Sequence, residues 1–297
     1  MNKISFYHSL IFFNLCIFLS AFEYLRDNNL LIMSLFLILS LGISHGALDH
    51  MKGQKLIRIL NFKSIISFYV LYILIGLSII FLWLLFPKIL LFVFLVVASF
   101  HFGKEDSEFI NYTPSQDLIY FFKGSLVVTA PILFHKAETL EIFNNLNFDI
   151  SQNLLISNEF LYLFLIVSFF ANIFISLNKK IEIKSILIMD FISILLLNYF
   201  LNPILAFTIY FCFLHSIRHS LKLSNELNKN NFIKGIKEFL IKVIPLTIST
   251  AIIFLISLFF LKNYYFLDNA ISKVIFIGLA SLTFPHILLE YLIEKNE

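Results

Sequence analysis

Long apolar runs alternate with short polar segments along the whole of this 297-residue chain. A bilayer core about 30 Å thick needs roughly 20 apolar residues for each helix that crosses it. By that measure the pattern predicts ten membrane-spanning helices, near residues 6–22, 30–48, 65–86, 88–103, 117–135, 155–177, 185–201, 203–219, 238–261 and 271–292. Two boundaries rest on a single proline each, Pro87 and Pro203, where a hairpin and a kinked helix fit equally well. The pattern therefore predicts eight to ten crossings.

Composition points to the same class of protein. Hydrophobic residues make up 59% of the chain and charged residues 14%, whereas about a quarter of a soluble domain is charged. Runs of this length without alternation at every second residue are typical of helices and not of barrel strands. Because no repeat, linker or polar domain interrupts them, we expect an all-α polytopic bundle in the lipid bilayer, with one domain over residues 1–297. No stretch suggests nucleic-acid binding.

Lysine and arginine give the expected orientation of this bundle. With ten crossings both termini lie on one side, and most of the basic residues fall in the loops of that side, including residues 52–63, 179–184 and 218–237. Cytoplasmic loops of membrane proteins collect Lys and Arg. The sequence therefore predicts an N-in/C-in protein of the cell (plasma or inner) membrane.

Six of the eight histidines fall at the predicted cytoplasmic ends of even-numbered helices. They are His45, His50, His101, His215, His219 and His286. A helix presents His215 and His219 on one face, because they are four residues apart. Carboxylates follow three of the others by one helical turn, namely Asp49, Glu105 and Glu290. Neutral imidazole is a common metal ligand, and a nearby carboxylate fixes its tautomer. These histidines and carboxylates therefore predict a metal site towards the cytoplasmic side.

Other polar residues have less specific explanations. His50 fits a ligand, a residue that supports a ligand and a surface residue equally well, and His286 is similarly ambiguous. We expect structural roles for His8 and His135. Asp190 lies inside a predicted span, where a hydrogen bond between helices is the simplest role for it.

Four motifs, in their order along a chain of this length, resemble the Brp/Blh family of bacterial and archaeal β-carotene 15,15′-dioxygenases. They are HGALDH at 45–50, HFGKED at 101–106, HSIRH at 215–219 and PHILLE at 285–290. The resemblance implies a non-haem Fe(2+) enzyme that uses O2 to split the central double bond of β-carotene into two molecules of retinal, for a microbial rhodopsin. The iron ligands that it implies are His45, His101, His215 and His219. The residues that it leaves as candidate supports of those ligands are Asp49, His50, Glu105, His286 and Glu290.

Three other functions compete with this interpretation. A membrane di-iron desaturase or hydroxylase also gathers histidines on the cytoplasmic side, but it needs more of them and H-x-x-H-H boxes, which this chain lacks. A haem carrier pairs two histidines across the bundle, whereas four or more compete here. A non-enzymatic helper that binds carotenoid or retinal is disfavoured only by the metal-binding pattern.

The expected depth of the metal raises a geometric question. The histidines end their predicted spans, whereas a polyene that crosses the bilayer is centred roughly 15 Å deeper, at half the bilayer thickness. Two arrangements would bring them together. Either the substrate lies obliquely or flat near the interface, or the helices place the metal deeper than the predicted span ends indicate.

Overall fold

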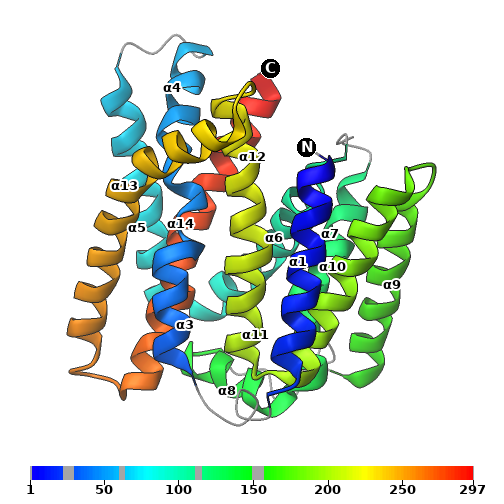
Figure 1. Cartoon of the computed structure of the whole chain (residues 1–297). Helices are drawn as coiled ribbons and strands as arrows, with labels where there is room; N and C mark the ends of the chain where they lie inside the picture. Colours follow the sequence, from blue (N-terminus) through cyan, green and yellow to red (C-terminus); the bar gives the residue numbers. More distant parts are fainter. Residues whose placement is uncertain (1, 23–29, 60–63, 111–115, 149–156, 297) are drawn as a thin grey trace.

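The computed structural model describes residues 2–22, 30–59, 64–110, 116–148 and 157–296, and every regular element within them is a helix (Figure 1). The elements are α1 (Asn2–Ser20), α3 (Leu31–Leu37), η1 (Ile38–Gly42), η2 (His45–Leu48), α4 (Asp49–Ile59), α5 (Ile65–Leu85), α6 (Pro87–Glu105), α7 (Asp117–Phe134), α8 (Lys136–Asn145), α9 (Asn158–Ser176), α10 (Ile181–Phe200), α11 (Pro203–Ile209), η5 (Tyr210–Ser216), α12 (Ile217–Leu227), α13 (Phe232–Leu261) and α14 (Leu267–Asn296). Among the described residues, 10 helical segments are long and apolar enough to cross a membrane. The prediction of an all-α polytopic membrane bundle is confirmed.

The two prolines each separate one helix from the next. Pro87 is the first residue of α6 and Pro203 the first residue of α11, where the fixed φ of proline suits a helix and its missing N–H costs no hydrogen bond. The side chain of Asn202 caps α11 by accepting a hydrogen bond from the amide of Leu205 at 2.9 Å. Figure 1 shows α1 beginning and α14 ending at the same end of the bundle, as an even number of crossings requires. The compartment that this end faces stays a prediction.

Two helices form an apolar edge of the bundle. In the most apolar stretch of α5 only 6% of the residues are buried, and in that of α13 only 17%. Large side chains such as Leu74, Phe81 and Ile253 are more than half exposed there. A continuous apolar surface of this kind is unfavourable in water, so it is the face that suits lipid.

The second predicted span is less regular than its sequence indicates. After α3 the chain passes through the wide π-helical turn η1 and the tight 3₁₀ turn η2 before α4 begins. η1 packs closely on a second π-helical segment, η5, because a Cβ on Gly42 would lie 2.7 Å from a ring carbon of Phe211. The hydroxyl of Ser216 also donates to the carbonyl of Gly42 at 2.9 Å. π-helical turns are frequent at functional sites, and these two adjoin His45 and include His215.

α6 and α7 cross at the closest range. A Cβ on Gly103 would lie 1.8 Å from the carbonyl oxygen of Tyr120, and one on Gly124 would lie 1.9 Å from that of Ser99. Glycine is the residue that lets membrane helices approach so closely. This crossing fixes the position of the end of α6, which carries the residues described next.

The short helix α8 was not predicted, because it lies between the predicted spans 117–135 and 155–177. It lies at the end of the bundle opposite to the termini (Figure 1). Thr139 ties it to α7, because its hydroxyl donates to the carbonyl of Pro131 at 3.0 Å. Its residues are mixed polar and apolar and too few to span a membrane.

Candidate metal centre

The carboxylate of Glu105 lies among four buried histidines. Its Oε2 atom is 3.4 Å from Nε2 of His101, 3.4 Å from Nε2 of His215 and 3.7 Å from Nδ1 of His219. Its Oε1 atom is 3.3 Å from Nε2 of His286. All five residues are at most 5% exposed. They come from four segments, α6, η5, α12 and α14, so the bundle has to assemble before the group exists.

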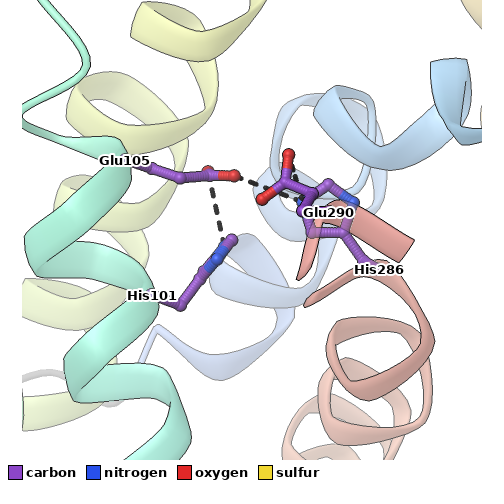
Figure 2. Close-up of side chains that lie close together, drawn as sticks. All are labelled: His101, Glu105, His286 and Glu290. Carbon is purple, nitrogen blue, oxygen red and sulfur yellow. Dashed lines mark hydrogen bonds and ion pairs between the residues drawn. The ribbon is translucent and has the colours of Figure 1, made fainter. Parts of the chain in front are cut away.

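Figure 2 shows the part of this group that α6 and α14 supply. His101 and Glu105 point from α6 towards His286 and Glu290 of α14, and one ligand atom from each of the four lies within 4.8 Å of the others. The spacing of four along each helix puts each pair on one helical face.

The distances fit a shared metal ion. Two atoms that bind one ion at about 2.1 Å lie about 3.0 to 3.4 Å apart in octahedral or tetrahedral geometry. The distances from Glu105 to the four histidine nitrogens, 3.3 to 3.7 Å, lie at or just above that range. They are longer than most N–H···O hydrogen bonds, which cluster at about 2.9 to 3.0 Å. Imidazole nitrogen and carboxylate oxygen are also the donors that non-haem iron takes.

The centre contains more negative than positive side chains. Its carboxylates are Asp49, Glu105, Asp106, Glu108 and Glu290, of which the first three are at most 5% exposed. Lys52 lies 2.5 Å from Glu290. Lys222 lies 2.6 Å from Glu108. Lys123 is also buried near Asp106. Because three lysines do not balance five carboxylates, a bound cation would stabilise the cluster.

A hydrogen bond to the carboxylate of Asp106 fixes the ring of His215. Nδ1 of His215 donates to Asp106 Oδ1 at 3.0 Å, and the hydroxyl of Tyr210 donates to Asp106 Oδ2 at 2.6 Å. Burial by itself raises the pKa of the Asp106 carboxyl, but the hydrogen bond from His215 lowers it below its ordinary value, so Asp106 is a carboxylate. With its proton on Nδ1, His215 presents the lone pair of Nε2 to the centre, as metal-binding histidines do.

The structure brings together three of the four histidines that the resemblance implies as ligands, namely His101, His215 and His219. The main chain of His45 begins η2, but its side chain lies outside the described part of the structure. Glu105 and His286, expected to support the ligands, lie as close to the centre as the ligands themselves. Which of these side chains bind metal stays a prediction.

The remaining histidines lie apart from the group. Nδ1 of His50 contacts the carbonyl of Ala47 at 3.0 Å, inside its own helical turn. Nε2 of His8 lies 2.8 Å from the carbonyl of Phe213, which ties α1 to η5. Nδ1 of His135 is 3.7 Å from Glu138, at the start of α8. The contacts of His8 and His135 fit the structural roles expected for them.

One buried ion pair was missed in the sequence. Arg218, counted among the loop charges, is 6% exposed and binds both oxygens of Asp190, at 2.6 and 3.0 Å. It also donates to the carbonyl of Asp106 at 3.1 Å and to the hydroxyl of Ser9 at 2.7 Å. The role expected for Asp190, a polar contact between helices, is the one that its hydrogen bonds show. The position of Arg218 between the two histidines of HSIRH is the sequence feature from which its burial could have been predicted.

The helices continue past the histidines. α4 runs on to Ile59, α12 to Leu227 and α14 to Asn296, each well beyond its last histidine. The centre therefore lies inside the bundle and not at its end. The continuations of α4 and α12 are polar, and α6 ends at Glu105, so they do not decide between the two arrangements, and the depth of the metal stays a prediction.

An apolar pocket of about 400 Å³ reaches the centre from one side. It is lined by α5, α13 and α14 together with η2 and the start of α4, and its polar end is formed by Asp49, Tyr72 and His286. Phe211, another lining residue, stacks on the ring of His215 with centroids 5.7 Å apart. A mostly apolar pocket with a few polar groups at one end is typical of a small-molecule site. An apolar molecule in it would contact His286 and Asp49.

Comparison with known proteins identifies the family. The family model described as beta-carotene 15,15′-dioxygenase matches residues 36–294. The chain belongs to the β-carotene 15,15′-dioxygenase family. It is also 27% identical over 267 residues to the β-carotene 15,15′-dioxygenase of the uncultured marine bacterium 66A03, covering 86% of this chain and 91% of that relative. No solved structure matches the chain.

Membership of the β-carotene 15,15′-dioxygenase family confirms the resemblance seen in the four motifs, and with it the predicted enzyme class, a carotenoid-cleaving dioxygenase. The matched range contains every side chain of the centre, from Asp49 to Glu290. The match to the family therefore covers the whole candidate site and not only one pair of helices.

Proposed function

We propose that the protein is an iron-dependent dioxygenase that uses O2 to cleave the central 15,15′ double bond of β-carotene into two molecules of all-trans-retinal. The observation that carries this proposal is the group of buried histidines around Glu105 at the polar end of an apolar pocket. The family match and the name of the bacterial relative support the choice of substrate. The donor atoms and the excess of carboxylates support a metal cation.

The iron ligands in this proposal are the four predicted histidines, His45, His101, His215 and His219, and the distances of Glu105 from the last three fit an ion that Glu105 binds together with them. When bound, iron would supply the redox chemistry that lets O2 react with a carbon–carbon double bond. Asp106 and Tyr210 hold His215 with its Nε2 towards the centre. Supports of this kind usually contribute about 10- to 100-fold to metal affinity or activity.

The pocket binds and orients the polyene. In this proposal apolar side chains of α5, α13 and α14 surround the hydrocarbon and exclude water. The reacting bond lies at the polar end of the pocket. Holding two reactants in place supplies a large part of many rate enhancements. Because α5 and α13 expose apolar side chains, the carotenoid enters from the lipid and the retinal leaves into it. In this proposal a microbial rhodopsin receives the retinal. The metal centre lies towards the cytoplasmic side of the cell membrane.

The test is to express the chain in a β-carotene-accumulating bacterium and to separate the pigments by HPLC. We expect β-carotene to be replaced by retinal, His215→Ala to abolish the product and His135→Ala, at the far end of the bundle, to retain it. Unchanged β-carotene with confirmed membrane expression contradicts the proposal. Metal analysis of the purified protein then decides between the alternatives, since two irons favour the desaturase-like enzyme and no iron favours the carotenoid-binding helper.

A further inference from the structure

His286 has the same surroundings as the predicted ligand His215. Nδ1 of His215 binds the carboxylate of Asp106, which accepts a hydrogen bond from Tyr210. Nδ1 of His286 lies 2.8 Å from both oxygens of Asp49, and the hydroxyl of Tyr72 donates to Asp49 Oδ2 at 2.7 Å. The first Tyr–Asp–His chain comes from η5 and the end of α6, and the second comes from α4, α5 and α14.

Both chains end on the same carboxylate. Nε2 of His215 is 3.4 Å from Oε2 of Glu105, and Nε2 of His286 is 3.3 Å from Oε1 of the same residue. The ring of His286 also lies 5.3 Å from that of His101 and 6.2 Å from that of His219, between centroids. His286 therefore stands within the group of histidines and not behind it.

A carboxylate on one ring nitrogen is the usual partner of a histidine that binds metal through the other nitrogen. With Asp49 accepting a hydrogen bond from Nδ1, His286 would present the lone pair of Nε2 to a metal ion at the centre. The contacts are buried, since Asp49 is 5% and His286 3% exposed. A histidine that served only to pair with Asp49 would not need its second nitrogen among Glu105, His101 and His219.

We propose that His286 is a metal ligand in addition to the four histidines of the motifs, and that Asp49 and Tyr72 are the residues that position it. This inference rests on the proposed iron centre. His286 also lines the apolar pocket, so a polyene bound there would contact it. Asp49 and Tyr72 then connect the pocket wall with the metal, because both line the pocket as well.

The test measures metal binding and not cleavage. The full-length protein is purified in detergent, stripped of metal and titrated with Co2+, whose visible absorption reports both affinity and coordination. We expect Asp49→Asn to weaken Co2+ binding about 10- to 100-fold, His286→Ala to weaken it at least as much and Tyr72→Phe to weaken it less than Asp49→Asn. His135→Ala is the matched control and should bind as the wild type does. Imidazole added to His286→Gly should restore part of the absorption.

The outcomes separate this inference from the function on which it rests. Wild-type affinity and spectrum in His286→Ala, in a protein that still cleaves β-carotene, overturn the ligand assignment and leave the proposed function intact. A wild-type protein that binds no Co2+ and no iron overturns both. If size-exclusion chromatography shows that His286→Ala is misfolded, His286→Gln, which keeps the approximate volume of the side chain, gives the same readout.

Discussion

Replacing Gly124 by alanine tests how the α6–α7 crossing sets the metal centre. The added Cβ would lie 1.9 Å from the carbonyl oxygen of Ser99 and 2.4 Å from the amide nitrogen of Gly103. Ordinary contacts begin at 3.4 Å, so the two helices have to separate by about 1.5 Å at this point. The obstructing atoms belong to the backbone, and no change of rotamer relieves them.

The expected magnitudes follow from that displacement. Overpacking a well-packed interior typically costs about 1 to 3 kcal/mol of the free energy of unfolding, and we expect the upper part of this range because no side chain can yield. His101 and Glu105 lie on α6 beside the crossing, and they meet His286 of α14. A misplacement of about 1 Å can cost about 100-fold in rate. Gly124→Ala should therefore lower the yield of retinal by about that factor.

The assay compares thermal unfolding of the detergent-purified protein with retinal formed per amount of enzyme. Gly103→Ala should behave in the same way, because its Cβ would meet the carbonyl of Tyr120. Ser249→Ala, on the exposed face of α13, is the control for a small substitution in a membrane helix. A Gly124→Ala protein with unchanged unfolding temperature and unchanged activity would refute the reasoning.

Three further predictions concern the ion pair, the support of His215 and the pocket. Arg218→Met leaves the carboxylate of Asp190 buried without its partner and should cost about 3 to 5 kcal/mol of stability, seen as a lower unfolding temperature; an unchanged temperature would contradict the pairing. Asp106→Asn should lower the iron content at a fixed supply of metal, with an affinity reduced about 10- to 100-fold; full iron content would mean that Asp106 does not support His215. Thr250→Trp should fill the pocket and reduce carotenoid conversion at unchanged iron content, whereas Ile252→Trp, which points to the outside of the same helix, should not; equal losses in both variants would rule out the pocket as the binding site.

The helices could be predicted closely because the membrane imposes their length. The run predicted near 65–86 is the helix Ile65–Leu85, and the two prolines mark the first residues of α6 and α11. Hydropathy does not identify elements whose length the membrane does not set. α8 is too short and too polar to be recognised, and the π-helical turn η1 has the same apolar composition as the helix before it.

The candidate site was predicted in its residue types and not in its geometry. Histidine and carboxylate at one helical turn can be read from the sequence, but the meeting of Glu105 with His286 joins residues 181 positions apart. The same limit applies to Arg218, whose charge suggests a loop until Asp190 is seen beside it. Tertiary packing decides both contacts, and it cannot be predicted from the pattern of a single sequence.

The position of the pocket between α5 and α13, the two helices with the most exposed apolar surface, has a consequence for kinetics. A substrate that reaches the pocket through lipid is supplied by diffusion in two dimensions. Its effective concentration is a mole fraction in the membrane and not a molarity in the surrounding water. Extra lipid or detergent, added at constant amounts of enzyme and carotenoid, therefore slows the reaction by surface dilution, while a larger volume of buffer leaves the rate of each enzyme molecule unchanged.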